Sequence, residues 1–322
     1  MIEDHYRRSP FFFMPTSPTH TVRLATDAMA TRFELVLVGD DPSHLRAAGE
    51  EAIREIERIA TRFSFYDKSS ELSSLNRQAS VAPQRVTGDL FELLQMCSRV
   101  HDQTGGAFDP TIGPLMRTWS FAAESTLPSK EDIQKAVSSV GWKHVRINPS
   151  DYTVFFDRPE IAIDLGGIAK GWALDEAASL LQENGVHRGL LHGGTSSVIA
   201  LGKPSDGTLW KVGIDDPYEE GWFTQAHLDN ESLSVSAIHG KSHEVRGIEY
   251  GHVIDPTTGE ARTGPIVASV QGSTAAYTDA WSTALIAMDP STPFQLFPGI
   301  SQAASFIKTD KNWIIRSGNW PE

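Results

Sequence analysis

The sequence predicts an α+β fold in which helices and strands occur in mixed order. Apolar side chains recur on one helical face from Ser43 to about Phe63, and again after Thr87. From about Val145 onward, short apolar runs separated by turn residues are typical of strands. Because helices and strands do not alternate strictly, an α+β class fits better than a strictly alternating one.

Helix ends and strand runs can be placed along the chain. Ser43 is the expected N-cap of the first helix, and Ser129 that of a short helix with Asp132 in a capping-box position. Helices are expected at 43–63, from 87 to 105, from 129, from 167 to 184, and at about 274–288. Strands are expected at 32–38, 144–147, 152–156, 161–165, 188–192, 196–201, 210–214, 232–236, 252–255, 268–272, 304–309 and 312–316.

The chain predicts one domain after a short arm. Residues 1–20 are rich in Pro, Ser, Thr and aromatic residues without periodicity, and predict an irregular N-terminal arm. Residues 21–322 then form a single domain. A lobe boundary near residues 140–150 is compatible with the change from helices to strands, although no linker-like segment marks it.

Composition and charge narrow the function classes. The chain has 322 residues, 40% of them hydrophobic, which is ample for a packed core. Its formal charge of −13 would repel a phosphate backbone, so no nucleic-acid partner is expected. The single cysteine, Cys97, excludes an intrachain disulfide and lies in an apolar run typical of a core. The apolar run Phe11 to Met14 is too short for a signal-peptide core or a membrane span, so a cytoplasmic protein is expected.

Residues 161–177 (IAIDLGGIAKGWALDEA) suggest a phosphate-binding turn. An apolar strand ends at Asp164, the glycines at 166 and 167 turn the chain, and a helix follows. Glycines let backbone N–H groups approach an anion, and the helix N-terminus adds partial positive charge. Lys170 would then lie beside a bound phosphate. The common phosphate-binding patterns are absent, so an ordinary strand–turn–helix junction with a solvated lysine is the alternative.

Residues 273–285 (STAAYTDAWSTAL) suggest a metal site. Asp279 and Thr283 lie four residues apart and share a helical face, which Ser282 can join. A carboxylate with hydroxyls is a hard oxygen set that suits Mg²⁺ rather than zinc. One carboxylate would hold Mg²⁺ weakly, so phosphate oxygens and a backbone carbonyl would have to complete the shell. Small residues packed inward explain the same spacing without a metal.

Residues 251–260 (GHVIDPTTGE) suggest a general base. His252 ends a strand before the strong turn signal Asp255-Pro256. An imidazole titrates near neutral pH, so beside a phosphate it could take a proton from an acceptor hydroxyl. A histidine that bonds a neighbouring turn is the alternative.

Two loops carry candidate ring contacts. Residues 104–121 contain Phe108-Asp109, followed by Trp119 and Phe121, whose rings could cover a flat ligand. Residues 64–78 contain the aromatic candidate Tyr66 and a polar, turn-prone stretch from Ser69 to Asn76. Each segment alone is also typical of a structured loop.

Together these segments resemble the FAD:protein FMN transferase (ApbE) family. The matching segments are DAMATRFEL, SFYD with SELSSLN, GAFDPTIGPL, IDLGGIAKGWALD, HVIDPTTG and TDAWSTAL, in the family order within residues 26–290. The resemblance implies an ApbE-like fold, with helices packed around two β lobes and a central FAD cleft. It further implies Mg²⁺ at the FAD pyrophosphate.

The resemblance also assigns roles, residue by residue. FAD contacts are implied for Met29, Tyr66, Ala107, Phe108, Asp109, Asp164, Lys170 and Ile254. Metal binding is implied for Gly167, Asp279, Ser282 and Thr283, and catalysis for His252 and Lys170. Asn76 matches a position linked to the choice between transfer and hydrolysis of FAD.

The sequence departs from the family pattern at a few positions. Val235 and Ala237 flank Ser236 where the family usually has a Thr-Ser-Gly triplet, and Thr195 stands where an acidic or amide residue is common. We expect these changes to affect the acceptor and the efficiency of transfer more than FAD binding.

The implied function is Mg²⁺-dependent transfer of FMN from FAD, the substrate, to a Thr or Ser hydroxyl of an acceptor flavoprotein, with release of AMP. The alternatives are an FAD pyrophosphatase that yields FMN and AMP, a non-catalytic FAD-binding protein, and an unrelated α+β scaffold. All the enzymatic interpretations require the turn at 164–170 to meet the helix at 279–283.

Overall fold

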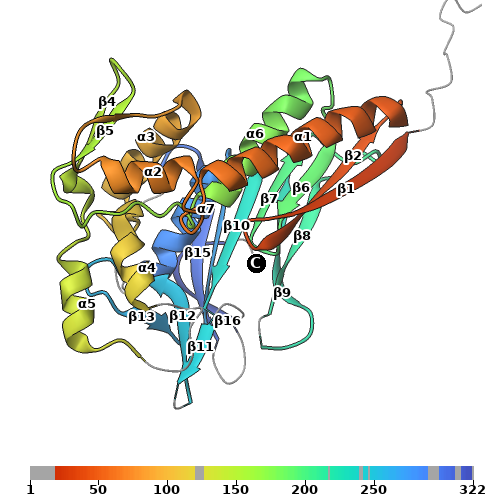
Figure 1. Ribbon diagram of the computed structural model, residues 1–322. Helices are drawn as coiled ribbons and strands as arrows, with labels where there is room; N and C mark the ends of the chain where they lie inside the picture. The colour runs from red at the N-terminus through yellow and green to blue at the C-terminus, as the bar shows by residue number, and fades with distance from the viewer. Residues whose placement is uncertain are drawn as a thin grey trace, which may run out of the picture.

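An eight-stranded antiparallel sheet forms the centre of the molecule (Figure 1). The computed structural model describes residues 19–119, 127–216, 218–238, 242–245, 247–288, 297–308 and 313–320. In sheet order the strands are β1 (His20–Ala28), β2 (Thr31–Gly39), β6 (Gly189–Gly193), β7 (Ser197–Leu201), β10 (Ser232–Ala237), β14 (Ile266–Gly272), β15 (Ile300–Lys308) and β16 (Trp313–Asn319). Pairing of β2 with β6 and of β7 with β10 brings distant parts of the chain side by side.

Three smaller sheets surround the large one. They contain β3 (Gln84–Arg85), β5 (Thr153–Phe156) and β4 (Val145–Asn148); β8 (Trp210–Asp215) and β9 (Trp222–Leu228); and β11 (Ser242–Val245), β12 (Ile248–Ile254) and β13 (Ala261–Thr263). The second is a hairpin beside the large sheet, and the third contains His252 on β12.

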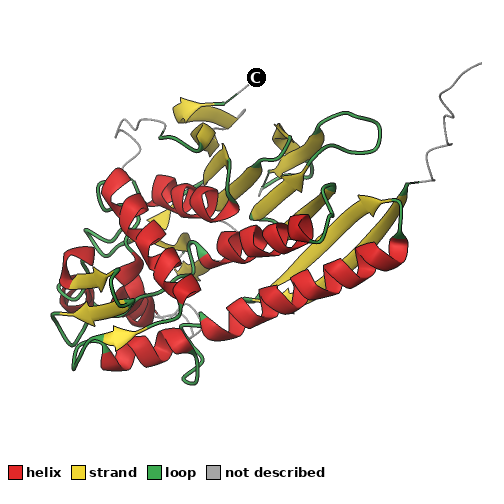
Figure 2. Ribbon diagram, turned by 90° about the horizontal axis from the view of Figure 1, so that it is seen from above, coloured by secondary structure: helices red, strands yellow, loops and turns green. Residues whose placement is uncertain are grey.

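The helices gather on one side of the large sheet (Figure 2). They are α1 (Pro42–Arg62), α2 (Glu71–Gln78), α3 (Gly88–Gln103), α4 (Gly113–Trp119), α5 (Lys130–Val137), α6 (Ala169–Glu183) and α7 (Ala275–Ala287), with short 3₁₀ turns at Pro110–Ile112 and Trp142–His144. α7 packs against α6 on one side and against β10 and β14 on the other. This central position makes α7 a buried element.

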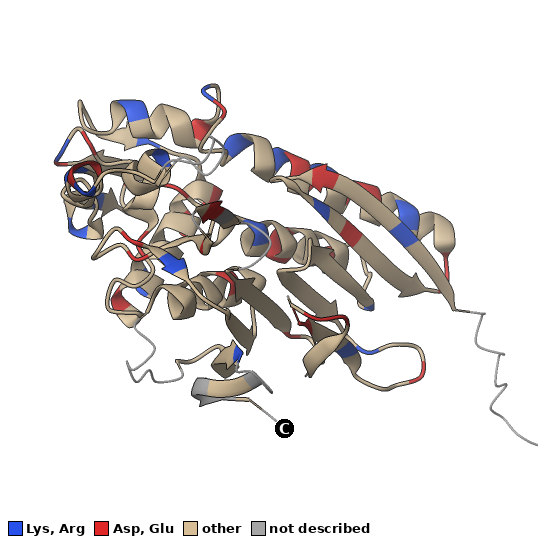
Figure 3. Ribbon diagram, turned by 90° about the horizontal axis from the view of Figure 1, so that it is seen from below, with Lys and Arg blue, Asp and Glu red and all other residues tan. Residues whose placement is uncertain are grey.

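α1 shows why these helices dock as they do. Its buried face includes Leu45, Ala52 and Ile56, which recur at helical spacing. Charged residues of both signs occupy its outer face (Figure 3). There Arg58 pairs with Glu55 within the helix, at 2.5 Å. Burial of the apolar face, rather than these exposed ion pairs, supplies most of the helix's stability.

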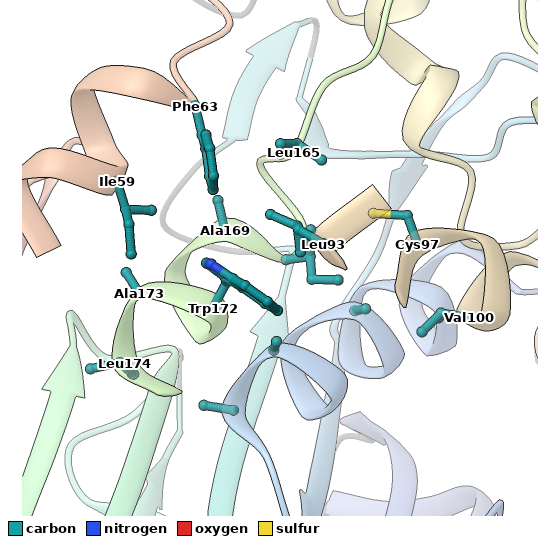
Figure 4. Close-up of a cluster of buried hydrophobic side chains, with 14 of the residues drawn as sticks. Ile59, Phe63, Leu93, Cys97, Val100, Leu165, Ala169, Trp172, Ala173 and Leu174 are labelled. Atoms are coloured by element: carbon teal, nitrogen blue, oxygen red, sulfur yellow. The ribbon is translucent and has the colours of Figure 1, made fainter. Parts of the chain in front are cut away.

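The large core cluster joins both halves of the chain. Leu93 of α3 and Trp172 of α6 belong to the same buried cluster (Figure 4). Cys97 is fully buried there, and burial raises the pKa of its thiol, which confirms its role as a core residue. Because one core takes side chains from before and after residues 140–150, we infer that residues 21–322 form a single domain.

The predicted α+β class is confirmed, and the expected helices begin and end within a few residues of their predicted positions. Ser129 caps α5 as expected, since its Oγ accepts from Asp132 N at 3.1 Å. The helix ends predicted at Gly105 and Asn184 correspond to those of α3 and α6.

Several local predictions were wrong. Asp41, not Ser43, caps α1, because its Oδ1 accepts from the amide of Ser43 at 2.8 Å. The stretch expected as a polar loop at 69–76 is largely α2, capped by Ser70. The run at 161–165 pairs with no described strand, because side-chain and loop partners take its backbone hydrogen bonds. The elements β1, β3, β9, β11, β13 and α4 were also not expected.

Residues 1–18 of the expected arm lie outside the described residues, and His20 already begins β1. Among the described helices, none combines the length and apolar character needed to cross a membrane.

Candidate active site

A buried extended segment, residues 161–165, leads into the site. Asn76 of α2 holds its centre: Asn76 Nδ2 donates to Ile163 O at 2.8 Å, and Ile163 N donates to Asn76 Oδ1 at 2.8 Å. The next amide, that of Asp164, donates to Pro110 O at 2.8 Å. These bonds replace a sheet ladder and fix the direction in which the glycine turn leaves the core.

The glycine turn brings the start of α6 against α7. Gly166 N donates to Asp164 Oδ1 at 2.7 Å. A Cβ on Gly167 would lie 3.2 Å from Thr283 Oγ1 and 3.4 Å from Phe108 Cε2, so little space remains beyond that of a glycine. α6 begins two residues later, which places Lys170 in its first turn.

Lys170 and Asp279 form a buried ion pair at this junction. Lys170 Nζ lies 3.2 Å from Asp279 Oδ2, and the two side chains are 14% and 3% exposed. Asp279 also accepts from Gly171 N at 3.2 Å and from Ser197 Oγ at 3.2 Å. Removing a carboxylate from water is costly unless it is paired and hydrogen-bonded, and these three donors provide that compensation.

The two hydroxyls after Asp279 differ in position. Thr283 Oγ1 donates to the Asp279 carbonyl at 3.1 Å, and Thr283 lines the cavity described below. Ser282 Oγ donates to the same carbonyl at 3.0 Å and lies 2.8 Å from Ser236 Oγ on β10. Ser282 is fully buried and is not among the described residues that line the cavity, so Thr283 is the better placed ligand candidate.

A cavity of about 870 Å³ opens above this junction. Its size lies toward the upper end of ligand pockets, which span roughly 300–1,000 Å³. Twelve of the residues named from the sequence line it: Met29, Tyr66, Ala107, Phe108, Asp109, Asp164, Gly167, Lys170, His252, Ile254, Asp279 and Thr283. The requirement that the 164–170 turn meet the 279–283 helix is therefore fulfilled.

Two of the residues named from the sequence have side chains that bond other parts of the protein. Asn76 does not line the cavity and uses its amide to hold Ile163. Asp109 lines it, but Asp109 Oδ1 accepts from Thr111 N at 2.8 Å, and Oδ2 accepts from Trp142 N at 3.2 Å. The Asp109 carboxylate thus holds its own loop against the 3₁₀ turn at Trp142–His144.

The aromatic lining differs from the expected one. Trp119 was expected to cover a ring, yet it is 7% exposed, packs on Tyr250, and donates from Nε1 to Gly259 O at 2.8 Å outside the cavity. Phe121 lies outside the described residues. Tyr66 is 77% exposed at the cavity, and Phe65 packs edge-to-face against it at 5.2 Å between centroids.

His252 reaches the cavity from β12. The imidazole is half-buried, and the neighbouring Ile254 is 4% exposed. The turn that follows is built as expected, since Asp255 Oδ1 accepts from the amide of Thr257 at 2.8 Å. His252 thus lines the same cavity as Lys170, although the two residues belong to β12 and α6.

A comparison with known protein families identifies the family of this chain. A family model described as the ApbE family matches residues 29–303, which is most of the chain and spans every named site residue. The chain belongs to the ApbE family. Its cavity and motifs can therefore be compared with those of relatives.

Relatives of this ApbE family member are enzymes by name. It is 27% identical over 285 residues to the FAD:protein FMN transferase of Klebsiella pneumoniae, covering 86% of this chain and 81% of the relative. The crystal structure of the Thermotoga maritima ApbE protein matches with a TM-score of 0.77 and 28% identity, covering 84% of this chain and 87% of that one. The flavin transferase ApbE from Vibrio cholerae matches with a TM-score of 0.77 and 26% identity, covering 92% and 97%.

Asp164 and Asp175, two buried carboxyl groups in this ApbE fold, have raised pKa values. Burial raises the pKa of Asp164, although the Gly166 amide and the charge of Arg117 lower it. Burial also raises the pKa of Asp175 in α6 to about 7, against the effect of two amides of α7 that donate to it. Carboxyl groups held in this way are candidates for functional or positioning roles.

Sequence reasoning missed part of the cavity lining. Val212 and Asp215 of the β8–β9 hairpin and Phe63 at the end of α1 also line the cavity. The hairpin residues follow ordinary strand alternation, and Phe63 reads as a core residue, so nothing local marks them. Only the tertiary arrangement could show that they face a ligand.

Proposed function

We propose that this protein transfers FMN from FAD to a Thr or Ser hydroxyl of an acceptor flavoprotein, with Mg²⁺ bound and with release of AMP. Membership of the ApbE family and relatives named FAD:protein FMN transferase support the reaction. The contact between Lys170 and Asp279 is the observation that carries the proposal, because it joins two distant motifs on one cavity wall.

The residues present fit a Mg²⁺ ion. The Asp279 carboxylate, Thr283 Oγ1 and the Gly167 carbonyl are hard oxygen donors within one junction, which Mg²⁺ prefers. No group of three His, Cys, Asp or Glu side chains suited to a metal occurs among the described residues, so an ion here would depend on hydroxyl, carbonyl and phosphate oxygens as well as on Asp279. Since Lys170 and the ion would share one carboxylate, the diphosphate of FAD would supply the further negative charge. When bound, Mg²⁺ would stabilise the charge that develops as the pyrophosphate bond breaks.

The lining divides naturally between the parts of FAD. Met29, Tyr66, Phe108 and Ile254 provide apolar and aromatic surface for the ring systems. Lys170 and the N-terminal turn of α6 provide positive charge for the phosphates. This division is what the family resemblance implies for these positions.

The chain's own groups account for the chemistry. His252 takes the proton from the acceptor hydroxyl as the oxygen attacks the FMN phosphorus. A new phosphoester bond forms, the pyrophosphate bond breaks, and AMP leaves with the bonding electrons. Lys170 offsets the negative charge on the phosphates.

Asp279→Ala tests the ion site. Purified protein would be incubated with FAD and MgCl₂, and FMN and AMP would be separated by chromatography. We expect the variant to lose Mg²⁺-dependent FAD cleavage, whereas Asp206→Asn, an exposed aspartate in a loop, should behave like the wild type. Wild-type cleavage by Asp279→Ala would refute the assignment of the metal.

His252→Ala tests the acceptor step. With a candidate acceptor protein present, transfer is read as a fluorescent acceptor band in a denaturing gel. The variant should bind FAD but give no such band, and His20→Ala, exposed on β1, is the control. Free FMN and AMP without a labelled acceptor from the wild type would favour a pyrophosphatase, and intact FAD would favour a non-catalytic binding protein.

A further inference from the structure

α7 contains Asp279 and Thr283, yet among the described residues no side chain of the helix or of its cap residues caps either end. The N-cap residue, Thr274, makes no side-chain cap hydrogen bond within the described part of the chain. All residues of α7 are described, and the helix has no acidic residue in its first turn and no basic residue in its last. The end groups of a buried helix lack water, so other elements must supply their partners.

Asp175 of α6 is the partner at the N-terminal end. Ala275 N donates to Asp175 Oδ1 at 2.7 Å, and Ala276 N donates to Asp175 Oδ2 at 2.8 Å. One carboxylate therefore accepts from the first two amides of α7. When Asp175 is ionised, its negative charge also faces the positive end of the helix dipole.

Arg262 of β13 is the partner at the C-terminal end. Its Nη2 donates to the carbonyl of Ala287, the last residue of α7. The same nitrogen lies 3.3 Å from Asp255 Oδ2, in the turn that follows the strand of His252. A guanidinium at this end complements the negative end of the dipole, so charged groups from two other elements hold α7.

α6 and α7 also meet backbone to backbone, one helical turn before Asp175. A Cβ on Gly171 would lie only 2.1 Å from Ala275 O. Gly171 N in turn donates to Asp279 Oδ2 at 3.2 Å. Because Asp279 lies four residues after Ala275, a single turn of α7 connects the capped end to the ion pair with Lys170.

We propose that Asp175 is a positioning residue that fixes the place of α7 against α6 and thereby holds the Asp279 carboxylate toward Gly167 and Lys170. Asp175 is not among the described residues that line the cavity, so it acts through α7. This inference rests on the proposed function, which supplies Mg²⁺ as the ion that Asp279 binds. The capping geometry itself does not depend on it.

Asp175→Asn tests the inference, because it keeps the side chain's shape and replaces one acceptor oxygen with an N–H donor. Mg²⁺ binding would be measured by calorimetry with ADP, which carries the adenosine and both phosphates present in FAD. We expect the affinity for Mg²⁺ to weaken about ten-fold, as for other groups that orient a metal ligand. Glu176→Gln, the neighbouring carboxylate on α6, should stay within about two-fold of the wild type.

A second substitution separates positioning from a general loss of structure. Thr274→Asp places a carboxylate at the N-cap of α7 itself and should restore most of the Mg²⁺ affinity in the Asp175→Asn background. Hydrogen exchange of the Ala275 and Ala276 amides should follow the same order, faster in Asp175→Asn and slower again in the double variant.

The outcomes are distinguishable. Unchanged Mg²⁺ affinity in Asp175→Asn, together with faster exchange of the Ala275 and Ala276 amides, would overturn the positioning role. A double variant in which amide exchange slows again but the Mg²⁺ affinity stays low would overturn it as well. A wild-type protein for which MgCl₂ has no effect on ADP binding would instead refute the proposed function, and amide exchange would still test the cap.

Discussion

Gly171→Ala should separate the two helices that form the floor of the cavity. The added Cβ would lie 2.1 Å from Ala275 O, 2.3 Å from Ala275 C and 2.5 Å from Ala276 N. Carbon atoms do not approach backbone atoms this closely, and backbone cannot rotate aside as a side chain can. α6 and α7 must therefore move apart by roughly 1 Å.

The magnitude follows from two opposing effects. Overpacking of a rigid contact costs about 1–3 kcal/mol, and here the obstacle is backbone, which favours the upper end of that range. Alanine gains about 0.5–1 kcal/mol over glycine in a helix. The net destabilisation is about 2 kcal/mol, which for a chain of this size lowers the unfolding midpoint by about 3 °C. Because a shift of about 1 Å misplaces reacting groups, FAD cleavage should fall about 100-fold.

Thermal unfolding and Mg²⁺-dependent FAD cleavage measure the two effects on the same samples. Gly88→Ala is the matched control, because this glycine begins α3 and a Cβ there would meet nothing within 4 Å. That control should keep full activity and gain up to about 1 kcal/mol of stability. A Gly171→Ala protein with the wild-type unfolding midpoint and wild-type FAD cleavage would show that α6 and α7 can repack freely. The contact between Gly171 and the backbone of Ala275 would then not limit stability or activity.

Three further predictions concern stability. Ala30 has a φ of +56° in the two-residue turn between β1 and β2, so Ala30→Gly should raise the unfolding free energy by about 1 kcal/mol. Ala47→Gly, on the exposed face of α1, should lower the unfolding free energy by a similar amount. An Ala30→Gly protein less stable than Ala47→Gly would refute the backbone strain at Ala30. Leu93→Ala, in the core, should lower the urea-unfolding free energy by about 2–5 kcal/mol, and a loss below 1 kcal/mol would show that the core collapses around the cavity. Burial raises the pKa of Asp175 from 3.8 to about 7, so its protonated form stabilises the fold fully below about pH 4, and this stabilisation is lost as the pH rises through 7. The unfolding free energy of the wild type minus that of Asp175→Asn should therefore fall by about 4 kcal/mol between pH 4 and pH 8. Parallel pH curves for the two proteins would contradict this.

Local sequence patterns predict the helix that carries the site but not its contacts. The spacing of Asp279 and Thr283 predicts a shared helical face, and both residues do line the cavity. The ion pair of Lys170 with Asp279 joins residues 109 positions apart, and no periodicity encodes such a contact. The family resemblance, rather than the spacing, predicted that these motifs meet.

Other failures have the same physical origin. α2 is a short helix whose Leu72 and Leu75 are buried by the rest of the fold, so tertiary packing overrides its polar, turn-prone sequence. Residues 161–165 have the composition of a strand, but Asn76 supplies the hydrogen bonds that a neighbouring strand would have supplied. Asp175 reads as an ordinary helical carboxylate, because its partners lie on a helix 100 residues later in the chain.

The departures from the family pattern gather on one wall of the cavity. Thr195, Val235 and Ala237 all line it, and the amide of Val235 donates to the carbonyl of Ser196 at 2.7 Å, which brings the two departing segments together. Lys170 and Asp279, which belong to the motifs that match the family, lie close by, because Asp279 Oδ1 accepts from Ser197 Oγ at 3.2 Å. Under the proposed function, FAD and the ion depend on Lys170 and Asp279, so we expect the altered positions 195, 235 and 237 to affect the choice of acceptor more than the cleavage of FAD.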